Sequence, residues 1–143
     1  MLKKNSLGVG LGFPYGFLGG NIDINIAPNF NLSAGLGSTI FAGMGYSFGC
    51  KYFLASVVRS FRPRVSAYYC VNTIVNYGSS LKDNESFTGL NLGLGFQLMW
   101  GRNKSNGFDF DIYYIATTSL EPEEVGVEAP GKVKVSLGYR YGF

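Results

Sequence analysis

Apolar and polar residues alternate with a period of two along most of the chain. Between Lys132 and Phe143, Val, Leu, Tyr and Phe fill the odd-numbered positions, and Lys, Ser, Gly and Arg fill the even-numbered ones. Successive side chains of a β-strand point to opposite faces, so this pattern predicts a strand with one apolar and one polar face. No segment shows a persuasive helical period.

The same alternation predicts eight strands. Their ranges are Leu7–Phe13, Ile22–Ile26, Leu32–Ile40, Met44–Phe48, Val65–Tyr77, Leu90–Trp100, Phe108–Thr117 and Lys132–Phe143. Tight polar turns are expected at 28–29, 59–63 and 101–107, in alternation with connections at 14–16 and 39–43 and two longer, more acidic ones. Both chain ends are then expected at the end of the short turns. The length of 143 residues predicts one domain, residues 1–143.

The glycines decide which face of the strands points inward. The chain contains 21 glycines, and many of them share the polar face with Ser, Asn, Asp, Lys and Arg. Glycine on the solvent side of a strand costs backbone entropy, whereas small residues suit the crowded inside of a narrow barrel. We therefore expect the small and polar residues to face a lumen and the apolar residues to face lipid.

This assignment predicts an all-β fold, an eight-stranded antiparallel up-and-down transmembrane β-barrel. Every backbone group in lipid must be paired, so the last strand must pair with the first. Aromatic residues are expected to form two girdles at the membrane interfaces. The first girdle comprises Phe30, Phe53, Trp100, Phe108, Tyr141 and Phe143 at the short-turn end, and the second comprises Phe13, Phe17, Tyr77 and Phe87 at the other end.

Other features of the composition exclude several classes of protein. No run approaches eighteen consecutive apolar residues, which excludes a transmembrane helix. The net charge of +3 is small and scattered, so no nucleic-acid partner is expected. The first residues lack the apolar stretch and cleavage site of a signal peptide. For an exported protein we expect that such a signal was removed and Met1 added.

The last eight residues carry a family resemblance. Ser136, Gly138, Tyr141 and Phe143 follow the pattern of a polar residue, a glycine and alternate aromatics ending in Phe. This octet resembles the signal read by the barrel-assembly machinery, and the whole chain resembles the small eight-stranded OmpA/OmpX-like outer-membrane proteins. The resemblance implies the outer membrane of a Gram-negative bacterium, with both termini periplasmic. The implied partners are membrane lipid, the assembly machinery and a protein of a larger outer-membrane complex.

Catalytic chemistry is not expected. The chain contains no histidine, whereas the membrane-barrel phospholipases, palmitoyltransferases, lipid A deacylases and omptins rely on His together with Ser or Asp. We therefore predict that the protein is not an enzyme and has no cofactor or metal site. The acidic residues Glu121, Glu123, Glu124 and Glu128 match no calcium-loop spacing, which favours a solvated loop over a loop that binds cations or a partner.

The candidate site consists of charged and amide residues at the alternate strand positions that are expected to face the lumen. We call these positions the inward phase of a strand. These residues form the predicted lumen polar network, which comprises Asp23, Lys51, Arg64, Asn91, Gln97, Asp109, Asp111, Lys134 and Arg140. One interpretation is a network of ion pairs that satisfies buried charges and plugs the barrel. The other is a narrow polar path or gate, for which the inward glycines would leave more room than usual.

Three functions follow from these patterns. The first is a structural scaffold, membrane anchor or interaction protein with recognition on extracellular loops. The second is a narrow channel for small solutes, and the third is a soluble lipocalin-like carrier whose apolar face would point inward around a ligand. Cys50 is expected to point outward and Cys70 inward, so a disulfide between them is not expected.

Overall fold

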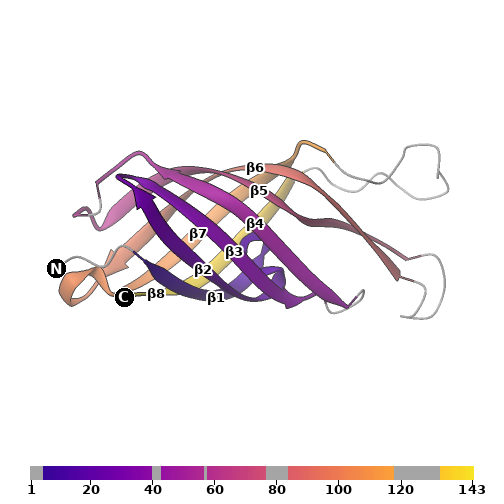
Figure 1. Cartoon of the computed structure of the whole chain (residues 1–143), viewed down its shortest axis with the longest axis horizontal. Helices are drawn as coiled ribbons and strands as arrows, with labels where there is room; N and C mark the ends of the chain where they lie inside the picture. Colours follow the sequence, from indigo (N-terminus) through magenta and orange to yellow (C-terminus); the bar gives the residue numbers. More distant parts are fainter. Residues whose placement is uncertain (1–4, 40–42, 57, 77–83, 118–132) are drawn as a thin grey trace.

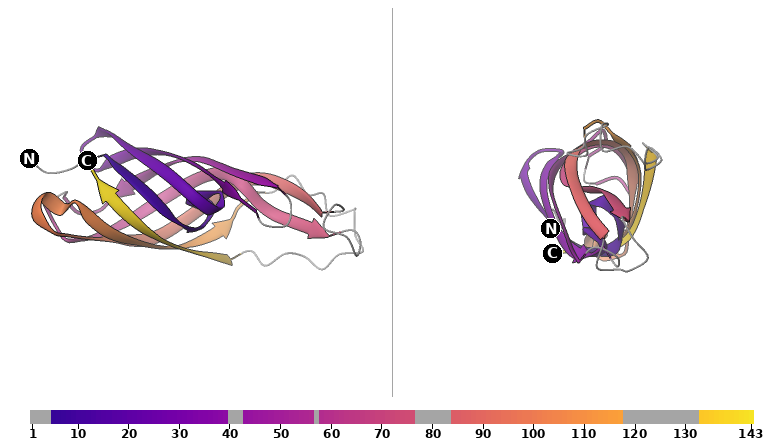
Figure 2. Two further views of the ribbon diagram at one scale, coloured as in Figure 1. Left: turned by 90° about the horizontal axis from the view of Figure 1, so that it is seen from below. Right: turned by 90° about the vertical axis from the view of Figure 1, so that its right-hand side faces the viewer.

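The computed structural model describes residues 5–39, 43–56, 58–76, 84–117 and 133–143. For 72–76 and 84–87 it describes the backbone alone. Within the described residues, eight antiparallel strands follow one another around a closed barrel (Figures 1 and 2). Every strand pairs with its neighbours in the sequence. The predicted all-β, eight-stranded, up-and-down antiparallel barrel is confirmed.

Each strand overlaps one that the alternation predicts, but β2 and β6 begin five and six residues earlier than expected and β4 ends five residues later. Their bounds are β1 Ser6–Gly12, β2 Phe17–Ala27, β3 Phe30–Ser38, β4 Met44–Phe53, β5 Phe61–Asn76, β6 Asn84–Trp100, β7 Asn106–Ile115 and β8 Val133–Gly142. Short 3-10 helices, η1 (Phe13–Tyr15) and η3 (Arg102–Lys104), follow β1 and β6. The turn expected at 59–63 is misplaced, because β5 already begins at Phe61 and the connection therefore precedes it.

Pairing of β8 with β1 closes the barrel. The register runs from Ser6 opposite Gly142 to Leu11 opposite Leu137. The backbone N–H of Phe143 also donates to the carbonyl oxygen of Asn5 at 2.9 Å. The predicted pairing between the last and the first strand is therefore present, and it leaves no free sheet edge in this part of the structure.

The two ends of the barrel differ. The β2–β3 turn, the β4–β5 connection, η3, the start of β1 and the C-terminus lie at one end, which we call the short-turn end (left in Figure 1). The turn at this end between Ala27 and Phe30 contains only two residues, and Asn29 has a positive φ of 64°, which asparagine tolerates better than most residues. The long strands β5 and β6 extend beyond the rest at the opposite end.

Large apolar side chains lie on the outside of the barrel. On β1 and β8, Leu7, Val9, Val135 and Tyr139 are each about half exposed, while their polar neighbours are buried or half-buried. This is the orientation that the glycine argument predicts. Because a β-strand presents alternate residues to its two faces, the apolar residues that share this phase point away from the barrel axis, with the exceptions described next.

Three aromatic or apolar positions depart from the predicted faces. Phe53 and Phe13, which we expected in the girdles, are 0% and 2% exposed and lie inside the barrel. Phe53 follows the inward phase of β4, and Phe13 belongs to η1, which turns inward. Val71 has the outward phase of β5 but is also buried, next to a shift in register between Val71 and Thr73. A β-bulge of this kind changes which face a residue occupies.

Candidate functional site

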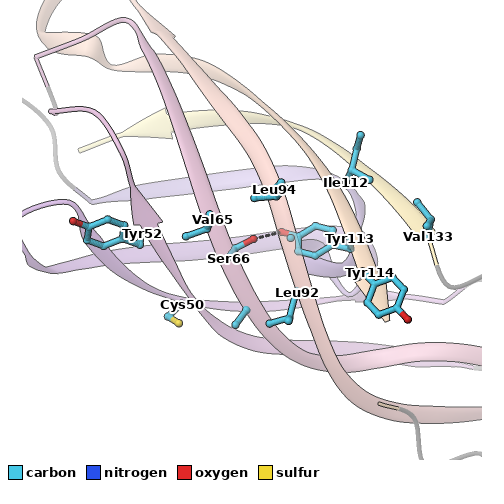
Figure 3. Close-up of a pocket in the computed structure, with 12 residues that line it drawn as sticks. Cys50, Tyr52, Val65, Ser66, Leu92, Leu94, Ile112, Tyr113, Tyr114 and Val133 are labelled. Atoms are coloured by element: carbon cyan, nitrogen blue, oxygen red, sulfur yellow. Dashed lines mark hydrogen bonds between the residues drawn. The ribbon is translucent and has the colours of Figure 1, made fainter. Parts of the chain in front are cut away.

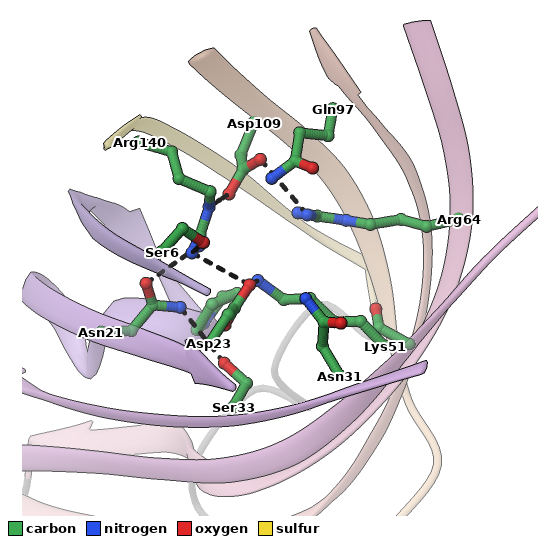
Figure 4. A network of polar contacts seen from close by, with 12 residues as sticks. Ser6, Asn21, Asp23, Asn31, Ser33, Lys51, Arg64, Gln97, Asp109 and Arg140 are labelled. Carbon is green, nitrogen blue, oxygen red and sulfur yellow. Dashed lines mark hydrogen bonds and ion pairs between the residues drawn. The ribbon is translucent and has the colours of Figure 1, made fainter. Parts of the chain in front are cut away.

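Six buried charges form a continuous chain of ion pairs across the barrel interior (Figure 4). Lys51 contacts Asp23 at 2.7 Å, and Asp23 also contacts Arg140 at 2.9 Å. Arg140 continues the chain to Asp109, which pairs in turn with Arg64 at 3.2 Å. Arg64 also forms a two-armed pair with Asp111, at the far end of the chain.

This chain joins residues that are distant in the sequence. Asp23 comes from β2, Lys51 from β4, Arg64 from β5, Asp109 and Asp111 from β7, and Arg140 from β8. The three cations and three carboxylates balance, and all six side chains are at most 1% exposed. Buried charges require partners of this kind, because each one loses its hydration on folding.

Neutral polar groups complete the network around Arg140. Its guanidinium donates to Ser6 Oγ and to Asn21 Oδ1, each at 2.9 Å, and Asn21 Nδ2 donates to Ser33 Oγ at 3.3 Å. The hydroxyl of Tyr15 donates to Asp109 Oδ2 at 3.1 Å. Each of the three guanidinium nitrogens of Arg140 therefore has a hydrogen-bond acceptor in the network.

The predicted network residues are not all equivalent in the structure. Six of the nine form the ion-pair chain described above. Gln97 is also buried and accepts from Arg62 Nη1 at 3.4 Å, whereas Asn91 donates to Cys70 Sγ and to backbone carbonyl groups nearer the opposite end. Lys134 has the inward phase but is half-buried, and none of the ion pairs between described side chains includes it.

The helix η1 lies inside the barrel, although it was not predicted as an inward element. All three of its residues, Phe13, Pro14 and Tyr15, are buried. Ser47 Oγ on β4 donates to the carbonyl oxygen of Pro14 at 2.9 Å, and Tyr15 is anchored to Asp109. The sequence pattern marked this segment only as a turn, because a Pro and two flanking glycines are equally typical of an outward loop.

Inward glycines make room for this helix. A Cβ atom at Gly10 or Gly138 would overlap the ring of Tyr15, and one at Gly35 or Gly37 would overlap the backbone of Pro14 or Tyr15. These positions belong to β1, β8 and β3, so η1 is surrounded by glycine. The expectation that the glycines leave extra room in the lumen is wrong at these positions, since η1 occupies that room.

Aromatic rings lie beyond η1, toward the end opposite the short turns. Tyr68 and Tyr113 are fully buried with their rings in an edge-to-face contact at 5.9 Å, and Phe13 lies 5.5 Å from Tyr113. Gly49 and Gly93 lie against these two tyrosines. The interior is therefore filled in layers, by ion pairs, by η1 and by tyrosine rings.

The outer surface carries a shallow apolar hollow of about 640 Å³ over β4 to β8 (Figure 3). Its floor includes Cys50 and Ala67, and larger residues such as Tyr52, Leu94 and Tyr114 surround it. Cys50 and Cys70 are both free thiols, Cys50 at this hollow and Cys70 in the interior. The expectation that they face opposite sides and form no disulfide agrees with the structure.

The last eight residues, which resemble an assembly signal, alternate between the two faces of β8. Ser136 is buried and Gly138 contacts Tyr15, whereas Tyr141 and Phe143 are about half exposed on the outside. Tyr141 is opposite Leu7 on β1 and Asn106 on β7. The octet thus forms part of the closing strand, and its role in assembly stays a prediction.

Among the described residues, no group of three or more His, Cys, Asp or Glu side chains is placed to hold a metal ion. No helix in the described part of the chain is long and apolar enough to cross a membrane. The acidic residues between 121 and 128 and the aromatic residues Tyr77 and Phe87 lie outside the residues with described side chains.

Comparison with known proteins does not assign a family. The chain matches no protein-family model, and no curated protein or solved structure is similar to it. The functional argument therefore depends on the geometry of the barrel.

Proposed function

We propose that this protein is an integral outer-membrane β-barrel that acts as a structural scaffold or membrane anchor, with recognition on the loops opposite the short-turn end. It carries out no catalysis and uses no cofactor. Both termini are periplasmic in this proposal. Its partners are membrane lipid, the barrel-assembly machinery during insertion and a protein of a larger outer-membrane complex.

The continuous apolar outer surface carries the proposal. Each of the eight strands exposes large hydrophobic side chains, among them Leu11 on β1, Leu36 on β3, Phe48 on β4, Leu94 on β6 and Val135 on β8. Soluble monomers rarely expose contiguous apolar patches larger than a few hundred Å². A surface that surrounds the molecule is energetically reasonable where lipid replaces water as the solvent.

The filled interior favours a scaffold over a transporter. The ion-pair chain connects strands on different sides of the barrel, and η1 occupies the space above it. A solute would have to displace both to pass. The polar inner surface nevertheless makes a narrow channel the second candidate function, with the ion pairs as its gate.

The soluble-carrier interpretation has less support. A lipocalin-like protein must direct its large apolar residues toward a central ligand. Here the interior holds charged, amide, glycine and tyrosine residues with a few apolar ones such as Phe13 and Phe53, whereas the large aliphatic side chains listed above face outward.

Refolding tests the proposal. The protein is transferred from denaturant into plain buffer, detergent or lipid vesicles, and folding is followed by far-UV circular dichroism and by gel mobility with and without boiling. We expect a β spectrum and a heat-modifiable band only with detergent or lipid. A folded, water-soluble monomer in plain buffer would contradict membrane residence.

Planar-bilayer recording separates the scaffold from the channel. The filled interior predicts no resolved conductance steps for the wild-type protein after insertion has been verified by gel mobility. Reproducible steps that depend on the ion pairs, and that change in an Asp109→Asn variant, would instead support the channel.

A further inference from the structure

A second cavity, of about 360 Å³, lies at the short-turn end of the barrel. Polar side chains from three segments line it: Asn25, Asn29, Asn31, Ser56 and Arg62. Amide, hydroxyl and guanidinium groups all donate hydrogen bonds. The size is in the range of small-molecule sites, which hold their ligands by a few placed polar groups.

Arg62 is the charged group of this cavity, and it has no carboxylate partner among the described side chains. It is only 7% exposed. Its hydrogen bonds, from Nε to the carbonyl oxygen of Ala55 and from Nη1 to Gln97 Oε1, are both long at 3.4 Å and both go to neutral groups. Its guanidinium carbon lies 3.8 Å from the centre of the Phe53 ring.

The interior charges show that Arg62 is in excess. Asp23, Asp109 and Asp111 are matched one for one by Lys51, Arg64 and Arg140 in the ion-pair chain. The guanidinium carbon of Arg64 lies 5.8 Å from the centre of the same Phe53 ring. The charged group that shares this ring with Arg62 is therefore another cation. An aromatic ring stabilises a cation only in part. A nearly buried positive charge in this setting is best compensated by an anion.

We propose that this cavity binds a singly charged oxyanion, a phosphate or carboxylate group, with Arg62 as its main ligand. The flat guanidinium matches the two oxygens of such a group, and the amides of Asn29 and Asn31 and the hydroxyl of Ser56 provide neutral donors around it. One excess positive charge corresponds to one negative charge on the ligand. The oxyanion is either a free small anion or the headgroup of a lipid.

Anion titration of the refolded full-length protein tests this site. The protein in an uncharged, phosphate-free detergent is titrated with inorganic phosphate and with acetate at constant ionic strength, with chloride as the reference salt. Binding is read by calorimetry and by NMR signals of the side-chain amides. We expect saturable binding that is at least about tenfold weaker in Arg62→Gln, because a charge-assisted hydrogen bond is lost. Arg59→Gln, which removes an exposed arginine at the same end, is the matched control and should bind as the wild type does.

Gln97→Glu separates loss of binding from loss of folding. It places a carboxylate where Gln97 Oε1 already accepts from Arg62, with almost no change of shape. We expect this variant to keep the heat-modifiable band and to lose anion binding, because Arg62 then has an internal partner. Equal anion binding in the wild type and Arg62→Gln, or wild-type binding in Gln97→Glu, would overturn the proposal.

Native mass spectrometry identifies the source of the oxyanion. Wild-type protein and Arg62→Gln are each refolded in phosphatidylglycerol vesicles and then transferred to detergent. Retention of lipid by the wild type and not by the variant assigns the site to a lipid headgroup. Arg62-dependent binding of phosphate or acetate without retained lipid assigns it to a free anion. Absence of both kinds of Arg62-dependent binding would refute the site.

Discussion

The charged residues of the interior act as a connected set. Asp23 and Asp109 each bridge two cations, so the loss of one member leaves others without full compensation. In a low-dielectric interior the cost of an unpaired charge exceeds the net gain from forming the pair. The phase of a side chain alone therefore does not determine its contribution to stability.

Two lysines make this argument testable. Lys51 and Lys134 both have the inward phase, but only Lys51 is fully buried and paired with a carboxylate. We expect Lys51→Met to lower the free energy of unfolding by about 3 kcal/mol, since Asp23 then keeps only Arg140. The matched change Lys134→Met should stay within about 0.5 kcal/mol of the wild type. Urea unfolding in lipid vesicles measures both, and equal effects would contradict the described network.

Sequence reasoning was successful where the period of two was unbroken. It placed Asp23, Lys51, Arg64, Asp109 and Arg140 on the inward face because each continues the alternation of a regular strand, within it or just beyond its predicted bounds. It could not tell that Lys134 stays outside the ion pairs, since alternation gives the face but not the partner. Arg62 was missed because the strand was expected to begin only after Pro63.

At the scale of elements, η1 and the glycine-rich strands depend on each other. The helix enters the barrel only because Gly10, Gly35, Gly37 and Gly138 carry no side chain toward it. The Pro and Gly residues between 13 and 16 predicted a turn but did not reveal this arrangement, because the direction in which a connection folds depends on the space left by other strands. The same limit explains why Phe13 was expected in a girdle.

A double-mutant cycle tests this dependence. The three atoms nearest to a Cβ at Gly138 would all belong to the ring and hydroxyl of Tyr15. We expect Gly138→Ala to destabilise the protein by about 1–3 kcal/mol through overpacking. In a Tyr15→Ala background the same substitution should cost close to nothing, because the overlapping atoms are gone.

Gly20 offers a control for this cycle. A Cβ there would meet only the carbonyl oxygen of Gly8, at 3.3 Å. Gly20→Ala should therefore have a small effect that is the same with or without Tyr15. Additive effects of Gly138→Ala and Tyr15→Ala, measured as free energies of unfolding, would show that η1 does not pack against β8.

At the scale of the whole molecule, the barrel reverses the usual distribution of residues. Charged side chains fill its interior, and aliphatic and aromatic side chains cover its outside. This reversal was predictable because glycine, small polar and charged residues alternate with large apolar residues along the regular strands. Irregular positions such as Val71 were not, since a β-bulge leaves no mark in the alternation.

Fluorescence quenching of Trp100 tests the central claim most directly. It is the single tryptophan of the chain, and it lies about half exposed on the outer face at the short-turn end of β6. In vesicles we expect strong quenching by phospholipids brominated near the headgroup end of the acyl chain and little by aqueous iodide, because tryptophan favours the membrane interface. Quenching by iodide as in free tryptophan, with no effect of brominated lipid, would contradict an outer surface that faces the membrane.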